Sequence, residues 1–173
     1  MPLIDVQQLE KTFRIAKHQR GVLGAVRNLA SREYREVRAV DGITFGIPAG
    51  EMVGCIGPNG AGKSTTIKML TGILVPTGGQ IEVGGLVPYR RRTEVARRIG
   101  VVFGQRTQLW WDLPLIESLD LLRHIYRVPA ERFHRNLDEF RSLLELDPFL
   151  ATPVRQLSLG QRMRGDLAAA LLH

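Results

Sequence analysis

Hydrophobic positions in the first part of the chain predict short strands and one clear helix. The mixed apolar and polar stretch from Leu3 to Leu9 predicts a strand that ends near Phe13, and the alternation from Ile43 to Ile47 predicts an edge or half-buried strand. The apolar run from Met52 to Ile56 is typical of a strand buried on both faces. A helix is expected from Lys63 to Leu70.

Farther along, the pattern changes from mixed to helical. It predicts a strand from Gln80 to Val83, a short basic helix from Arg90 to Arg98 and a brief buried strand from Val101 to Phe103. Helices then follow at about 114–127, at about 130–146 and from Ser158 onward, separated by prolines. The sequence therefore predicts an α/β part over residues 1–104, with an insert at 14–38, and a mainly helical part over residues 105–173.

Composition favours a globular protein of the cytoplasm. Hydrophobic residues make up 44% of the chain, and no stretch reaches the ~18 consecutive apolar residues of a membrane span. The first residues lack the basic and apolar regions of a signal peptide. Cys55 is the only cysteine, which excludes internal disulfides and cysteine-cluster metal sites.

The net charge of +7 leaves three kinds of partner open: nucleic acid, an anionic membrane surface or a phosphate ligand. The basic residues are spread over several segments, and no basic-aromatic RNA-binding motif occurs among them. No nucleic-acid partner is therefore expected.

One segment carries a strong chemical signal, the pattern G-x-x-x-x-G-K-S that begins at Gly57. Its glycines allow backbone dihedrals that direct successive N–H groups at phosphate oxygens, and the next helix adds its positive end. Lys63 is expected to reach the β- and γ-phosphates of ATP, and Ser64 to offer its hydroxyl to Mg²⁺. The predicted ATP-binding residues of this loop are Gly57, Pro58, Asn59, Gly60, Ala61, Gly62, Lys63, Ser64 and Thr65.

The loop from Gly57 to Thr65 resembles the Walker A motif of ABC-type ATPases, and two further segments resemble motifs of that family in the same order. Residues 102–105, Val-Phe-Gly-Gln, resemble the Q-loop, and residues 157–162, Leu-Ser-Leu-Gly-Gln-Arg, resemble the LSGGQ signature. The run 104–114 and the basic insert are similar to ATP-binding subunits of ABC-2-type exporters. The resemblance implies a P-loop NTPase core with N-terminal antiparallel strands and a helical subdomain.

The resemblance also implies roles for single residues. Gln105 is similar to the glutamine that touches Mg²⁺ and the attacking water, so Lys63 and Gln105 are the expected catalytic residues. Ser158, Gly160 and Gln161 are similar to the residues that close on ATP held by a second subunit. Leu159 stands where the family usually has glycine, and it is expected to be tolerated if only the backbone and Ser158 face the phosphate.

Three predictions have open alternatives. Adenine is expected to stack on Phe13, with Tyr34 as the alternative. Trp110 and Trp111 are either anchors for a membrane partner or one core and one surface residue. The insert at 14–38 is predicted to be a solvated hairpin extension, and the alternative is a basic segment that lies on lipid headgroups.

The family's Asp-Glu pair and switch histidine are not assignable, because the chain ends at His173 inside a helix-forming run. The expectation is a fold incomplete at its C-terminus, in a fragment that binds ATP weakly and hydrolyses it poorly.

The resemblance implies an ATP-binding subunit that couples ATP hydrolysis to transport, with export expected, through a separate membrane permease. Such a subunit forms a homodimer or heterodimer of ATPases and lies on the inner face of the membrane. The alternatives are a soluble ABC ATPase that acts on ribosomes and a non-hydrolysing nucleotide-binding remnant. A GTPase is disfavoured because no Asn-Lys-x-Asp motif occurs.

Overall fold

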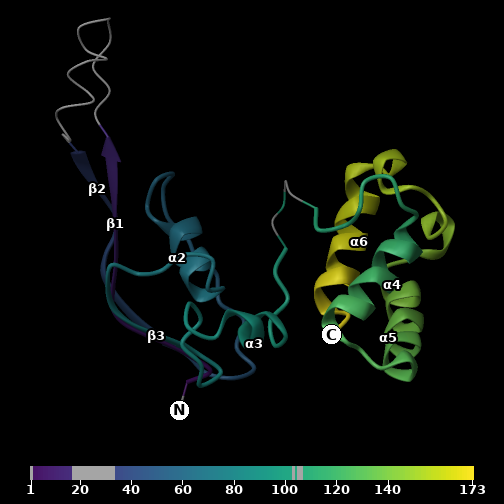
Figure 1. Cartoon of the computed structure of the whole chain (residues 1–173), viewed down its shortest axis with the longest axis horizontal. Coiled ribbons are helices and arrows are strands. Elements are labelled where there is room, and N and C mark those ends of the chain that lie inside the picture. Colours follow the sequence, from purple (N-terminus) through teal and green to yellow (C-terminus); the bar gives the residue numbers. More distant parts are fainter. Residues whose placement is uncertain (1, 17–33, 103, 105–106) are drawn as a thin grey trace, which may run out of the picture. The chain divides into compact units, whose positions relative to one another are not determined.

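The computed structural model describes the whole chain except residues 1, 17–33, 103 and 105–106. Contacts divide the chain into two units, Met1–Val95 and Ala96–His173 (Figure 1). The first unit contains β1 (Ile4–Ala16), β2 (Tyr34–Ile47), α2 (Lys63–Leu70) and β3 (Gly78–Val83), and α3 (Arg92–Ala96) lies at the boundary. The second contains α4 (Leu115–Tyr126), α5 (Ala130–Leu143), two 3-10 turns (Asp147–Phe149 and Val154–Gln156) and α6 (Leu159–Leu171).

The first unit is built on an antiparallel sheet in the order β2-β1-β3. Its side chains pack with Met69 of α2 into one small core, so the helix is held against the sheet. The core residues are Val6, Leu9, Val40, Met69 and Ile81. This packing fixes the start of α2 and, with it, the loop that precedes the helix.

β1 and β2 continue as a hairpin beyond the part of the sheet that β3 covers (Figure 1). Arg14 pairs with Glu36 and Ala16 with Tyr34 across the ladder, and the Arg14 guanidinium lies 3.1 Å from the Glu36 carboxylate. The described ends of the predicted insert therefore form an antiparallel ladder. Residues 17–33, and with them the alternative of a segment on lipid, lie outside the described residues.

Two predicted buried strands are wrong in this structure. Residues 51–56 have no regular secondary structure, Met52 and Ile56 are fully exposed, and Cys55 is exposed as well. Val101 and Val102 also lie outside any strand, and Val102 is exposed. A strand is stable only when a neighbour satisfies its backbone N–H and C=O groups. In the described part of the chain, no strand pairs with either segment.

The second unit is a helical cluster in which α4, α5 and α6 pack side by side (Figure 1). The predicted helices agree with these three, because apolar residues recur on one face at the spacing of a helix. On α4 this face carries Leu115, Leu119 and Leu122, and all three are buried. Among the described helices, none has the length and apolar character needed to cross a membrane.

α6 lies unusually close to the segment that precedes α4. A Cβ atom added at Gly165 would lie 2.8 Å from Leu115 Cδ1 and 3.1 Å from Leu109 Cδ1, so a larger residue there would require these two leucine side chains to shift. The next residue, Asp166, is buried, and its Oδ1 accepts hydrogen bonds from the Thr107 hydroxyl (2.8 Å) and the Gln108 backbone N–H (3.2 Å).

Burial raises the pKa of the Asp166 carboxyl above its usual value. The two hydrogen bonds from Thr107 and Gln108 and the positive charge of Arg162 act in the opposite direction and offset part of this effect. Keeping the Asp166 carboxyl ionised in the folded protein therefore costs free energy.

Leu119→Ala is expected to lower the free energy of unfolding by about 2–5 kcal/mol, because it leaves a cavity in the core of the second unit. Leu121→Ala, on the partly exposed side of the same helix, is the matched control and is expected to cost less than about 1 kcal/mol. Urea denaturation of both variants measures the difference. Equal losses would show that the two faces of α4 are not distinguished by burial.

The raised pKa of Asp166 predicts a pH dependence of stability. The folded state keeps a proton on Asp166 at pH values where the unfolded chain has released it, so stability falls as pH rises from the unfolded pKa to the folded pKa. Asp166→Asn removes this loss, and its free energy of unfolding relative to the wild type should increase across that interval. Urea denaturation at a series of pH values measures it, with Asp138→Asn on α5 as the control for deleting an exposed carboxylate. A difference that stays constant or shrinks as pH rises contradicts the prediction.

Candidate functional site

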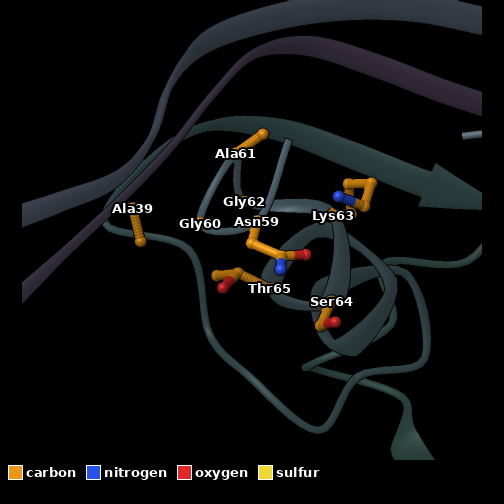
Figure 2. Close-up of a pocket in the computed structure, with 8 residues that line it drawn as sticks. All are labelled: Ala39, Asn59, Gly60, Ala61, Gly62, Lys63, Ser64 and Thr65. Atoms are coloured by element: carbon orange, nitrogen blue, oxygen red, sulfur yellow. The ribbon is translucent and has the colours of Figure 1, made fainter. Parts of the chain in front are cut away.

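The predicted phosphate-binding loop lines an open depression of about 220 Å³ at the start of α2 (Figure 2). The lining residues come from β2, from the loop and from the first turn of the helix. They are Ala39, Asn59, Gly60, Ala61, Gly62, Lys63, Ser64 and Thr65. The structure therefore brings together seven of the nine residues predicted for this loop and adds one, Ala39, from another element.

Two glycines give the loop its shape. Gly60 and Gly62 both have φ of 86°, a region that side chains with a Cβ atom rarely adopt. A Cβ atom at Gly62 would also overlap the carbonyl oxygen of Ala39 and lie 3.1 Å from Val40 Cγ2. Gly62 caps α2 in this left-handed conformation, so the chain turns into the helix directly against β2.

Lys63 is held inside the loop rather than extended into solvent. Its ammonium group donates hydrogen bonds to the carbonyl oxygens of Gly57 (2.6 Å) and Pro58 (2.8 Å). An ammonium group has three N–H donors, so one remains for a ligand oxygen. The contacts place a positive charge beside the depression at a fixed position.

The first turn of α2 suits an anion. It contains no acidic residue, and the positive end of the helix dipole adds to the charge of Lys63. Ser64 and Thr65 place their hydroxyl groups in the same turn (Figure 2). The donor set, the turned glycine backbone and the absence of negative charge in this turn together fit a polyphosphate.

Ser64 is the described residue predicted to contact Mg²⁺, and its hydroxyl fits that role because the ion prefers oxygen ligands. In the described ranges, no group of three or more His, Cys, Asp or Glu side chains is arranged to hold a metal ion.

The predicted signature residues lie in the second unit, at the start of α6. Ser158 caps this helix: its hydroxyl accepts from the Gln161 N–H (3.2 Å), and the Gln161 side-chain oxygen accepts from the Ser158 N–H (2.9 Å). Gly160 has open space around it, and the Leu159 side chain is exposed. Leucine therefore fits at position 159 in this unit without displacing its neighbours.

Two other predicted residues, Phe13 and Tyr34, are not among the described residues that line the depression. Gln105 lies outside the described residues. The predicted strand end near Phe13 is wrong, because β1 continues to Ala16. Phe13 is half-buried, and the Lys11 ammonium lies 5.2 Å from its ring centroid. Tyr34 begins β2 and is exposed.

Trp110 and Trp111 are both exposed, so the alternative of one core and one surface residue is wrong. Their predicted role as anchors for a membrane partner is compatible with this exposure and stays a prediction.

Ala39 is the lining residue that sequence reasoning missed. It lies on β2, more than twenty positions before Lys63, and no pattern in the sequence links the two. The only available signal was indirect: a glycine before the lysine implies that some backbone atom lies close by, without saying which one.

Comparison with known proteins gives a family for the chain. The family model described as ABC transporter matches residues 40–173. The daunorubicin resistance ATP-binding protein DrrA3 of Streptomyces coeruleorubidus is 36% identical over 83% of this chain and 45% of its own length. The Nod factor export ATP-binding protein I of Ralstonia nicotianae is 32% identical over 82% of this chain and 44% of its own length. The chain thus spans about half the length of these relatives.

Solved structures of ATP-binding proteins are similar to this chain. The dimeric structure of the ATP-binding cassette MJ0796 in a post-hydrolysis state, bound to ADP and Pi, matches 98% of this chain and 69% of its own, with 25% identity and a TM-score of 0.74. A structure of the ATP-binding subunit of an ABC transporter matches with 24% identity and a TM-score of 0.70, which shows the same fold. The predicted α/β P-loop fold is thereby confirmed. With a glycine-turned phosphate loop, a capped signature-like helix and a family match over most of its length, the chain belongs to the ABC transporter family of ATP-binding proteins.

Proposed function

We propose that this chain is the ATP-binding part of an ABC exporter, in which ATP binding and hydrolysis move a separate membrane permease. The observation that carries the proposal is the loop at the start of α2, where Gly62 turns the backbone against β2 and Lys63 is held beside an open depression. Such a loop binds phosphate chains by geometry and charge.

In this proposal, the loop binds the phosphates of ATP. The Ala61 N–H donates to the Pro58 carbonyl at 3.2 Å, so the proposed donors are the other N–H groups of residues 60–64 and the third N–H of Lys63. Their bonds to phosphate oxygens are strong because the acceptor is charged. Ser64 holds Mg²⁺, which neutralises charge on the phosphates when bound. Phe13, which is half-buried on β1, is proposed to stack on adenine.

The start of α6 is proposed to act on the ATP held by a second subunit. Ser158, Gly160 and Gln161 form a capped helix N-terminus with no acidic residue in its first turn, and this end of the helix favours a phosphate. The hydroxyl of Ser158 and the open space at Gly160 allow close approach. In a pair of two copies, or of this protein and a related ATPase, each ATP would lie between the P-loop of one subunit and the signature of the other.

Gln105 is proposed to orient the attacking water beside Mg²⁺, and Lys63 to stabilise the charge that develops on the phosphates. Family membership supports ATP hydrolysis in general, since catalysis of phosphoryl transfer rests on positioning and electrostatic stabilisation.

Export, a permease partner and a place on the inner face of the membrane are part of the same proposal. They are supported by relatives whose names describe drug resistance and Nod factor export. The exposed Trp110 and Trp111 are the surface proposed to contact the permease, because aromatic side chains anchor interfaces.

Lys63→Ala is expected to weaken ATP binding roughly ten- to hundred-fold, because it removes a charged hydrogen-bond donor from the phosphate site. Lys68→Ala, on the exposed side of the same helix, is the matched control and should bind ATP as the wild type does. Titration with a fluorescent ATP analogue and Mg²⁺ measures both. The proposal fails if the two variants bind alike.

Gly62→Ala should abolish ATP binding, because its Cβ atom collides with Ala39 and forces the loop away from β2. Gly60→Ala has the same φ of 86° but meets no protein atom within 4 Å, so it carries only the backbone strain of about 1–2 kcal/mol. The same titration compares them, with thermal unfolding as a check of the fold. Equal losses of binding would mean that backbone strain, and not the contact with β2, determines the conformation of the loop.

A further inference from the structure

A single carboxylate oxygen holds the beginning of the segment 107–111 on α6. Asp166 Oδ1 accepts from the Thr107 hydroxyl (2.8 Å) and from the Gln108 backbone N–H (3.2 Å). The Thr107 hydroxyl oxygen in turn accepts from the Leu109 N–H at 3.0 Å. The backbone at 107–109 is therefore ordered by one side chain of α6 and not by regular secondary structure.

The contacts continue residue by residue. The Trp110 N–H donates to the hydroxyl of Ser118, which is fully buried on α4 (3.2 Å). The Trp111 carbonyl accepts from the Arg155 N–H at 2.9 Å, and the Arg162 guanidinium of α6 lies 5.0 Å from the Trp111 ring centroid. Each of residues 107–111 thus contacts another part of the helical unit.

Apolar packing also places the segment 107–111 against α6. Leu109 is buried, and a Cβ atom at Gly165 would lie 3.1 Å from its Cδ1 atom. The segment is therefore pressed onto α6 at the residue directly before Asp166, and the polar contact and the apolar contact fix the same spacing.

The interactions that favour the charged form of Asp166 are these two hydrogen bonds and the positive charge of Arg162. A buried carboxylate costs free energy unless it is hydrogen-bonded, and an apolar residue would pack at lower cost. What the carboxylate oxygen adds is direction, since it accepts from two donors of one segment at once. This favours a role in setting the position of 107–109 over a role in stability alone.

We infer that Asp166 is a positioning residue that locks the segment 107–111 onto α6, so that this segment and the signature-like start of the helix move as one piece. Ser158 lies eight residues before Asp166, or about 12 Å along the helix axis. The segment begins two residues after Gln105 in the sequence. The inference rests on the proposed function for the roles of these two motifs, and it assigns the link between them to Asp166.

The test compares Asp166→Ala, Asp166→Asn and Thr107→Val with Asp138→Ala as the matched control, a helical aspartate on the exposed side of α5. Hydrogen exchange of a peptide covering 107–111 reports the lock directly. Thr107→Val removes one hydrogen bond to Asp166 and should speed exchange roughly tenfold, whereas Asp166→Ala removes both and should speed it by at least as much. Asp166→Asn keeps an acceptor oxygen and should stay near the wild type, as should Asp138→Ala. Peptides of α5 should exchange at the wild-type rate in the Asp166 and Thr107 variants.

ATP affinity and turnover of the purified protein test the functional half. Asp166→Ala and Thr107→Val should lower kcat while the Kd for ATP stays within about twofold, because the phosphate loop belongs to the other unit. Unchanged exchange at 107–111 in Asp166→Ala overturns the inference, and so does unchanged kcat alongside faster exchange. A wild type that binds no ATP would refute the proposed function instead, and the exchange rates would still decide whether Asp166 locks the segment.

Discussion

The contact between Gly62 and the backbone of β2 is the constraint on which the phosphate site depends. Because nothing larger than glycine fits beside the Ala39 carbonyl, the loop turns tightly and α2 begins against the sheet. Met69, farther along α2, packs into the core with Val6 and Leu9 of β1 and keeps the helix in place. The Gly57 and Pro58 carbonyls hold the Lys63 ammonium in place, so a ligand that binds this group loses little further entropy of ordering it.

The helical unit also has a glycine at a close approach, followed by a polar residue. Gly165 allows close packing, and Asp166 then uses that closeness to bond two donors of a segment without regular structure. In both units, a glycine lies at a close approach between two segments, and the next residue in the sequence makes polar contacts there.

Local pattern predicted a large part of this structure. The spacing of apolar residues gave α2, α4, α5 and α6 to within a few residues, because helix formation depends on neighbours three and four positions away. It was wrong for 52–56 and 101–102, where apolar runs indicated buried strands. Strand formation depends on a partner that is distant in sequence, and apolar composition alone does not supply one.

The sequence by itself determined the chemistry: a glycine-rich loop with Lys63 and Ser64, and a signature-like helix start at Ser158, are visible as spacing because each lies within one short segment. Only the tertiary structure decided which distant groups complete them. Ala39 lies beside the phosphate loop because β2 pairs with β1, and Asp166 holds Thr107 because α6 packs against the segment before α4. Such contacts join residues tens of positions apart, and no local pattern encodes a distance across the fold.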